Sequence, residues 1–208
     1  MKAKSALLFA LTLLFACQPS DHETIETFDE QGHLKERFVR RKADFAKNGL
    51  YQRFAPDGHY VEEAVFRNDT LDGERKFFYP NGKVEIIEPN RNGVIHGKYR
   101  KFFEDGSIAL EQDYVNGVLE GESLAWYPNG MLKERVSFQK NEENGPFKEW
   151  HPNGQPKTEG NYLTPDDPDF SGDREDGELR MYDSLGQLER IMDCRLGVCR
   201  TKWVRDGN

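Results

Sequence analysis

The sequence predicts an all-β protein, an elongated single-layer antiparallel meander of about seven stacked β-hairpin repeats. Three observations predict this fold. Glycines recur every 24 residues, a second glycine follows each of them nine residues later, and an aromatic residue lies between the two. A unit of that length is too short to bury a core by itself, so the copies must stack on one another. The function of such an array is expected to lie on its surface.

The first glycine of each copy sets the frame of the repeat. These glycines are Gly49, Gly73, Gly97, Gly121, Gly145 and, after a longer gap of 32 residues, Gly177. The second glycines are Gly58, Gly82, Gly106, Gly130, Gly154 and Gly186, and a degenerate opening copy carries Gly32. We expect this opening copy and the cysteine-containing last hairpin to cap the array, because the ends of a stacked array lack a neighbour.

Each repeat predicts one β-hairpin. Its turn reads Pro-Asp-Gly or Pro-Asn-Gly in the copies that begin at Gly49, Gly73, Gly121 and Gly145. Proline cannot adopt the positive φ that a two-residue type I′ turn requires. We therefore expect a three-residue loop, in which a type I turn is closed by a left-handed glycine. A second turn, at Asn92-Gly93 and Asn116-Gly117, leads to the next hairpin.

The loop sets the pairing register of the hairpin. An aromatic residue then faces an apolar residue six positions later in every copy, a pattern that a slip of one residue would destroy. The expected pairs are Phe28 with Leu34, Phe54 with Tyr60, Phe78 with Val84, Phe102 with Ile108, Trp126 with Leu132, Trp150 with Pro156 and Tyr182 with Leu188. Further along the same strand face we expect Phe66, Tyr114, Phe138 and Tyr162. Rings of adjacent repeats would then pack together along the array.

A second row of residues follows the paired aromatics directly. It consists of Tyr79, Phe103, Tyr127 and His151, and the alternation of a strand would point it to the opposite face. Two interpretations stay open. The row is either an exposed binding face for a protein or a glycan, or it is buried by coiling of the sheet.

The first residues predict export from the cytoplasm. Lys2 and Lys4 precede an apolar run from Ala6 to Ala16, which is too short to span a bilayer, so residues 1–16 are expected to be a signal peptide. The segment Leu14-Phe15-Ala16-Cys17 resembles a bacterial lipobox, which implies a lipid on Cys17 and a tether over residues 17–24. An ordinary signal peptide is the alternative. The expected location is the bacterial cell envelope, with the chain anchored to a membrane and facing the periplasm or the exterior.

Two further cysteines, Cys194 and Cys199, form an even pair in a chain that is expected to be exported. Oxidising compartments favour disulfides, and the spacing suits a cross-strand pair around a terminal turn at Leu196-Gly197-Val198. We therefore expect a disulfide within a C-terminal cap over residues 194–208. Free thiols are the alternative.

The sequence carries no motif that predicts an enzyme. The five histidines lie in separate segments, and no Ser-His-Asp order, phosphate-binding loop or zinc motif is present. We expect no catalytic residue, cofactor or metal. The stretch Asp167 to Glu178 spaces its oxygens as an EF-hand loop does, but Phe170 and Arg174 depart from that pattern and no helices are expected beside it. An acidic solvated loop is the preferred interpretation.

Charge is unevenly distributed along the chain. The formal net charge is −8, which makes nucleic acid an unsuitable partner. Basic residues dominate near the expected anchor, where they outnumber Glu36 and Asp44; they are Lys35, Arg37, Arg40, Arg41, Lys42, Lys47 and Arg53. They would lie near lipid headgroups, where an anionic leaflet would attract them. An ordinary solvated basic face is the alternative. The acidic far end, Glu159 to Asp193, is expected to project away from the membrane.

The repeat pattern resembles the MORN-variant repeat over about residues 25–193. The resemblance is clearest in Gly73-Glu-Arg-Lys-Phe-Phe-Tyr-Pro-Asn-Gly-Lys-Val and in Gly121-Glu-Ser-Leu-Ala-Trp-Tyr-Pro-Asn-Gly-Met-Leu-Lys-Glu. It implies an elongated antiparallel meander used for contacts with other molecules. Bacterial proteins of this kind are often labelled YwqK-type toxin–antitoxin antitoxins, but an exported chain could not reach a cytoplasmic toxin.

Three functions follow from these observations. The first is a non-enzymatic cell-envelope lipoprotein whose repeats form a protein-interaction scaffold. The alternative is an antitoxin or immunity-type protein that neutralises an exported toxin. A hydrolase acting on envelope polymers is the least favoured.

Overall fold

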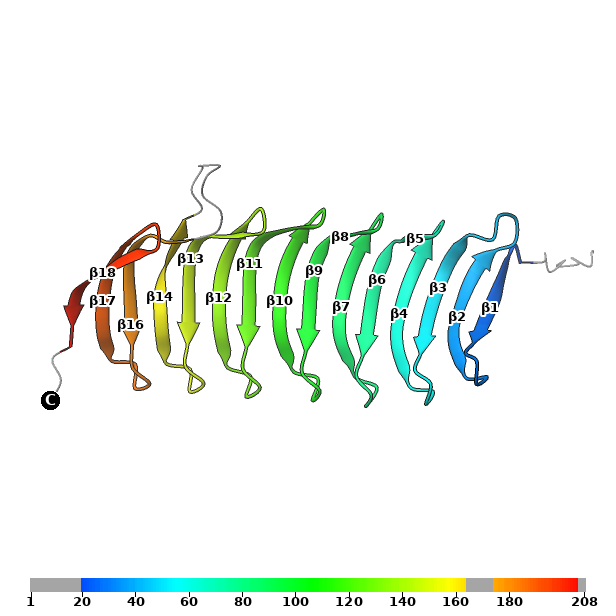
Figure 1. The fold of residues 1–208 in the computed structure, drawn as a ribbon, viewed down its shortest axis with the longest axis horizontal. Coiled ribbons are helices and arrows are strands. Elements are labelled where there is room, and N and C mark those ends of the chain that lie inside the picture. Colours follow the sequence, from blue (N-terminus) through cyan, green and yellow to red (C-terminus); the bar gives the residue numbers. More distant parts are fainter. Residues whose placement is uncertain (1–19, 164–173, 206–208) are drawn as a thin grey trace, which may run out of the picture.

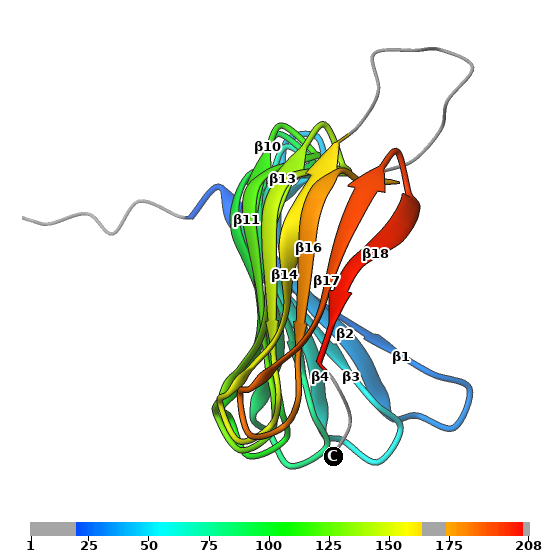
Figure 2. The same ribbon diagram turned by 90° about the vertical axis from the view of Figure 1, so that its left-hand side faces the viewer.

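The computed structural model describes residues 20–163 and 174–205, which form one open antiparallel sheet of 18 strands and contain no helix (Figure 1). Each strand pairs with its neighbours in the chain, so the sheet is a meander that lengthens by one hairpin at a time. No second layer of described residues covers either face (Figures 1 and 2). The predicted fold class is confirmed.

Seven hairpins and one additional strand make up the described sheet. The strands are β1 (His22–Phe28), β2 (Leu34–Arg41), β3 (Lys47–Phe54), β4 (Tyr60–Arg67), β5 (Thr70–Leu71), β6 (Gly73–Phe78), β7 (Val84–Arg91), β8 (Val94–Ile95), β9 (Gly97–Phe102), β10 (Ile108–Val115), β11 (Val118–Trp126), β12 (Leu132–Gln139), β13 (Glu142–Trp150), β14 (Pro156–Leu163), β15 (Arg174–Glu175), β16 (Gly177–Tyr182), β17 (Leu188–Arg195) and β18 (Val198–Val204). The two-residue strands β5, β8 and β15 continue into β6, β9 and β16 after a break of one residue. The last strand, β18, pairs with β17 and ends the sheet.

The hairpin loops have the predicted geometry. In the hairpin β6–β7 the Gly82 amide donates to the Tyr79 carbonyl at 2.9 Å, and the Tyr79 amide donates to the Lys83 carbonyl at 2.9 Å. Gly82 has a φ of +81°, the left-handed conformation that closes a three-residue loop. All seven predicted pairs of an aromatic and an apolar residue lie opposite each other, from Phe28 with Leu34 to Tyr182 with Leu188.

A β-bulge follows each of these pairs and changes which residues share a face. Phe78 lies opposite Val84 but Phe77 lies opposite Ile86, so Glu85 is an extra residue in the returning strand. One extra residue inverts the alternation of everything beyond it. The prediction that Phe66, Tyr114, Phe138 and Tyr162 share a face with Phe54 and its equivalents was therefore wrong. These four residues lie on the opposite face, or pair with residues there.

The two faces of the sheet differ in packing. We call one the ring face; it carries the seven aromatic residues of the predicted pairs and their apolar partners. We call the other the glycine face; it carries the first glycine of each repeat. The most buried side chains, Tyr51, Ala64, Val136 and Phe147, all lie on the glycine face. The core is therefore concentrated on one side of a single layer.

Ring contacts run mostly within hairpins rather than between them. On the glycine face Tyr51 meets Phe66 with ring centroids 5.6 Å apart, and Phe147 stacks on Tyr162 at 4.3 Å. On the ring face Tyr60 meets Phe78 of the next hairpin at 4.7 Å. In the later hairpins an aliphatic residue or a proline takes the place of Tyr60, so the continuous row of touching rings that we expected is limited to the N-terminal part.

Five of the second turns are two-residue turns with positive φ at both positions, as in type I′; they are Asn68-Asp69, Asn92-Gly93, Asn116-Gly117, Lys140-Asn141 and Leu196-Gly197. Asn92 and Gly93 have φ values of 51° and 81°, and Arg91 and Val94 lie opposite each other beside them. The Gly93 amide donates to the Leu71 carbonyl of the preceding turn at 2.8 Å. These turns follow one another along one edge of the array, and the strands curve along their length (Figure 2).

A buried carboxylate links the second and third hairpins. Glu62 on β4 is 5% exposed and accepts hydrogen bonds from Arg53 Nε at 2.8 Å and from Arg75 Nε at 2.7 Å. Arg53 belongs to the same hairpin, whereas Arg75 lies on β6 of the next one. A carboxylate in this position is stabilised only by its partners, so it joins the two repeats.

Candidate functional site

The four residues predicted as a binding face lie directly after β6, β9, β11 and β13, four strands that end at the lower edge of the sheet in Figure 1. Three of them contact the next hairpin. The Tyr79 hydroxyl donates to the Phe102 carbonyl at 2.7 Å, the Tyr127 hydroxyl donates to the Trp150 carbonyl at 2.9 Å, and His151 Nε2 lies 3.1 Å from the Tyr182 carbonyl. Phe103 occupies the same position without a polar atom. All four side chains are half-buried, three of them connect consecutive repeats, and the role of the row in binding stays a prediction.

Asparagines of the hairpin loops form a second ladder beside this row. Asn129 accepts a hydrogen bond from the Met131 amide at 3.0 Å and donates one from Nδ2 to the Pro152 carbonyl at 2.7 Å. Asn81 and Asn153 make the same two kinds of contact. Asp57 and Asp105 accept the contact within their own turns, but a carboxylate cannot donate to the next one. The turn sequence therefore also encodes contacts between repeats, which sequence reasoning missed.

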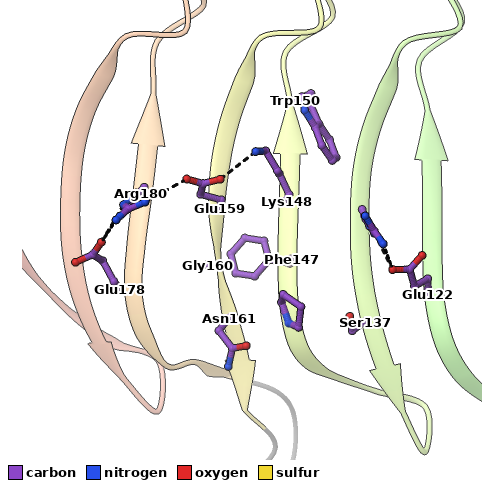
Figure 3. A pocket seen from close by; sticks show the side chains of 12 residues that line it. Glu122, Ser137, Phe147, Lys148, Trp150, Glu159, Gly160, Asn161, Glu178 and Arg180 are labelled. Carbon is purple, nitrogen blue, oxygen red and sulfur yellow. Dashed lines mark hydrogen bonds and ion pairs between the residues drawn. The ribbon is translucent and has the colours of Figure 1, made fainter.

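The ring face is hollowed over β11 to β16 by a groove of about 690 Å³ (Figure 3). The groove lies where the side chains of the ring face become short. Pro146 stands where other hairpins carry Leu50, Glu74, Lys98, Glu122 or Glu178, and Ser137 and Asn161 lie on the strands beside it. Nothing in the repeat pattern alone indicated this groove, because it depends on substitutions in two adjacent copies.

Ion pairs line the groove. Lys148 Nζ lies 3.0 Å from a Glu159 oxygen, and Arg180 lies 3.7 Å from Glu159 and 2.7 Å from Glu178 (Figure 3). Arg135 pairs with Glu122 at the other end. Three carboxylates thus face three cations, and the charge of the lining is balanced. Trp150 also lines the groove, with Lys148 Nζ 5.7 Å from its ring centroid.

The central carboxylate of the groove stays ionised at neutral pH. The Tyr182 hydroxyl donates to Glu159 at 2.5 Å, and this bond, together with the bond from Lys148, lowers the pKa of Glu159 against the opposing effect of burial. Burial and the same hydrogen bond raise the pKa of Tyr182. A general acid needs a carboxyl whose pKa is raised, and Glu159 has the opposite shift.

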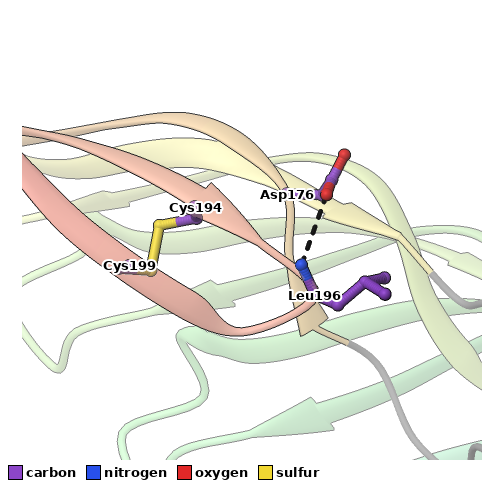
Figure 4. The surroundings of a disulfide bond; sticks show 4 residues. All are labelled: Asp176, Cys194, Leu196 and Cys199. Carbon is purple, nitrogen blue, oxygen red and sulfur yellow. Dashed lines mark hydrogen bonds between the residues drawn. A yellow bond between two sulfur atoms is a disulfide. The ribbon is translucent and has the colours of Figure 1, made fainter.

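The predicted disulfide is confirmed at the C-terminal hairpin (Figure 4). Cys194 on β17 lies directly opposite Cys199 on β18, with their Cα atoms 3.9 Å apart. The turn between the strands contains two residues, Leu196 and Gly197, one fewer than we expected. The Leu196 amide donates to Asp176 Oδ1 at 3.3 Å, which ties this turn to the preceding repeat.

The basic N-terminal end is largely paired with acidic residues that the sequence count left out. Arg37 bonds to Glu26 and Arg40 to Glu23, each at 2.8 Å. Lys47 Nζ lies over three rings of the glycine face, at 4.9 Å from Phe38, 4.8 Å from Tyr51 and 5.4 Å from Phe66. The positive charge left for other partners is therefore smaller than the local composition indicates.

Several predictions fall outside the described residues. The expected signal peptide, Cys17 and residues 167–173 of the acidic stretch Asp167 to Glu178 belong to this group. Within residues 20–163 and 174–205, no three His, Cys, Asp or Glu side chains are placed to hold a metal ion. No helix in the same ranges is long and apolar enough to cross a membrane.

Comparison with protein families matches the central hairpins to a known repeat. The model of the MORN repeat variant matches residues 71–89, 95–116, 119–140 and 143–163. The chain is a MORN-variant repeat protein. Each matched segment coincides with one hairpin, from β5–β7 to β13–β14. The outer hairpins keep the same paired aromatic, loop glycine and register, so the same hairpin geometry extends beyond the matched segments.

MORN repeats are generally associated with binding to proteins or membranes. No curated protein matches this sequence. The type of repeat is therefore known, and the partner of the array has to be inferred from the residues on its surface.

Proposed function

We propose that this chain is a non-enzymatic lipoprotein of the bacterial cell envelope, whose MORN-variant repeats form a scaffold for a protein partner. The main support for this proposal is the single-layer sheet. Among the described residues, no second layer covers either of its faces. Ladders of hydrogen bonds and ion pairs connect the repeats along both edges and the centre. Such an array presents a long, preorganised surface, which reduces the entropic cost of binding.

The chemistry of the groove supports a non-enzymatic role. Its carboxylates are engaged in ion pairs with Arg135, Lys148 and Arg180, and Glu159 has a lowered pKa. Hydrolysis of a glycosidic bond would require one carboxyl that is protonated near neutral pH.

The envelope location rests on the N-terminal sequence and on the disulfide. The segment before Cys17 has the form of a signal peptide that ends in a lipobox. The Cys194–Cys199 bond is of the kind that persists in oxidising compartments. A lipid on Cys17 would hold the array at a membrane surface.

Two experiments test this function. Fractionation of cells that express the full chain should place it in the membrane fraction, and the Cys17→Ser variant should be released from it. Cross-linking in intact cells, followed by purification in mild detergent and mass spectrometry, should then recover a protein partner in constant ratio to the chain. Recovery of the full chain in the soluble fraction, or retention of the Cys17→Ser variant in the membrane fraction, would contradict the anchor. Capture of a toxin would favour the immunity role instead.

The predicted binding row can be tested separately. The hydroxyl-free variants Tyr79→Phe and Tyr127→Phe keep the rings but lose the bonds to the next hairpin, whereas serine at the same positions removes the rings as well. A partner that is lost only with the serine variants, at unchanged thermal stability, would assign the rings to binding. A large loss of stability with serine would assign them to the packing of the array.

A further inference from the structure

The groove on the ring face combines dense polar groups with no net charge. Glu122, Glu159 and Glu178 are balanced by Arg135, Lys148 and Arg180. A charged polymer would gain little from such a lining, because attraction and repulsion cancel over its length. A ligand with many hydroxyl groups fits better, since paired carboxylates and cations still have free lone pairs and N–H groups for hydrogen bonds.

Aromatic residues of the ring face recur with a spacing that suits a linear polymer. Trp126, Trp150 and Tyr182 occupy the same position in consecutive hairpins, and each is partly exposed. Consecutive hairpins are two strands apart, which corresponds to about 9.6 Å. A β-1,4-linked polysaccharide repeats its shape every disaccharide over a similar length. The flat C–H face of a pyranose ring packs well on an aromatic ring, which offers a large apolar surface.

We propose that the ring-face groove binds an extended, uncharged β-1,4-linked polysaccharide that lies across the strands. The groove runs from Glu122 on β11 to Arg180 on β16, five neighbouring strands that span about 19 Å, or about two disaccharide units. Trp150 contacts the face of one sugar. Lys148, Glu159 and Arg180 form hydrogen bonds with hydroxyl groups on the adjacent units. This site goes beyond the protein scaffold proposed above and does not depend on the lipid anchor.

Calorimetric titration of the full chain in mild detergent with fully N-acetylated chitohexaose, an uncharged β-1,4-linked hexamer called chitohexaose below, tests the site. We expect binding that changes little with salt, because the ligand carries no charge. Maltohexaose, an uncharged hexamer of the same length, is the ligand control, since its α-linkages do not allow the extended shape. The Trp150→Ala variant should bind chitohexaose about thirtyfold more weakly, as for a central tryptophan contact. The control Trp203→Ala removes a tryptophan that is 42% exposed on β18, outside the groove, and should bind normally.

A second variant covers the possibility that Trp150→Ala disturbs the sheet. The Arg180 side chain is 49% exposed, so Arg180→Gln should leave the circular dichroism spectrum and the melting temperature nearly unchanged. It should still weaken the binding of chitohexaose several-fold. No heat of binding with millimolar chitohexaose would overturn the proposal. Equal affinity for maltohexaose, or unchanged affinity in a folded Trp150→Ala or Arg180→Gln variant, would do the same. Recovery of a protein partner is a separate result that these outcomes do not affect.

Discussion

Replacing Glu62 by glutamine should destabilise the array more than the same change elsewhere on the sheet. Glu62 is 5% exposed and accepts one hydrogen bond from Arg53 of its own hairpin and one from Arg75 of the next. Glutamine keeps the size of the side chain but removes the charge, and its amide group presents N–H donors to two arginines that can only donate. The substitution therefore breaks a contact between repeats without creating a cavity.

The structure sets the magnitude of this effect. A hydrogen bond to a charged group contributes about 1.5–3 kcal/mol. Arg53 and Arg75 are 40% and 35% exposed, so solvent screens part of each interaction. We expect Glu62→Gln to lower the free energy of unfolding by about 2–3 kcal/mol. For a chain of this size that loss corresponds to a fall in melting temperature of about 5–10 °C.

The assay is urea denaturation followed by circular dichroism, with Glu111→Gln as the matched control. Glu111 also has two cationic partners, Lys98 at 3.0 Å and Arg100 at 2.9 Å, but both lie on β9 of its own hairpin and its side chain is 20% exposed. The control should lose about 1 kcal/mol or less. Equal losses in the two variants would refute the reasoning that the bond between repeats is the important one.

Three further substitutions test other contacts that hold the array together. Asn129→Asp should cost about 1 kcal/mol in urea denaturation, because the turn keeps its acceptor but loses its donor to the next repeat, and an unchanged midpoint would contradict this role. Gly73→Ala should cost about 1–3 kcal/mol by the same assay, since φ is +138° and the added Cβ would lie 3.2 Å from Val65 Cβ; a neutral effect would show that the backbone bend there is dispensable. The Tyr182 hydroxyl lowers the pKa of Glu159 from 4.5, so the ionised carboxylate stabilises the folded state. This contribution to the free energy of unfolding is fully present above pH 4.5 and is lost as the pH falls through the lowered pKa. Glu159→Gln should therefore reduce the pH dependence of the free energy of unfolding measured between about pH 6 and 3.

The spacing of glycines, rings and turns was sufficient to predict the strands and their pairing, and the even pair of cysteines predicted the disulfide. Phe78 lies opposite Val84 as expected because proline in the loop restricts the turn type. Face assignment beyond that pair failed, since the extra residue at Glu85 carries no distinctive side chain. A β-bulge without glycine leaves little trace in a single sequence.

The candidate site was harder to predict than the fold. The row of Tyr79, Phe103, Tyr127 and His151 was visible in the repeat, but its bonds to the next hairpin depend on how neighbouring loops are placed. The groove arises from short side chains in adjacent copies, and one of its ion pairs, between Glu159 and Arg180, joins two hairpins. Contacts between repeats cannot be read from the pattern within one repeat.

Removal of one whole repeat, combined with a distance measurement, tests the central claim that equivalent hairpins are stacked into one ribbon. Spin labels at Lys83→Cys and Gln155→Cys would lie three repeats apart at exposed, equivalent positions. Their separation should be about 29 Å from the strand spacing, and deletion of residues 97–120 should shorten it to about 19 Å in a chain that still folds. An unchanged distance, or loss of the folded state on deletion of this single repeat, would contradict the stacked array.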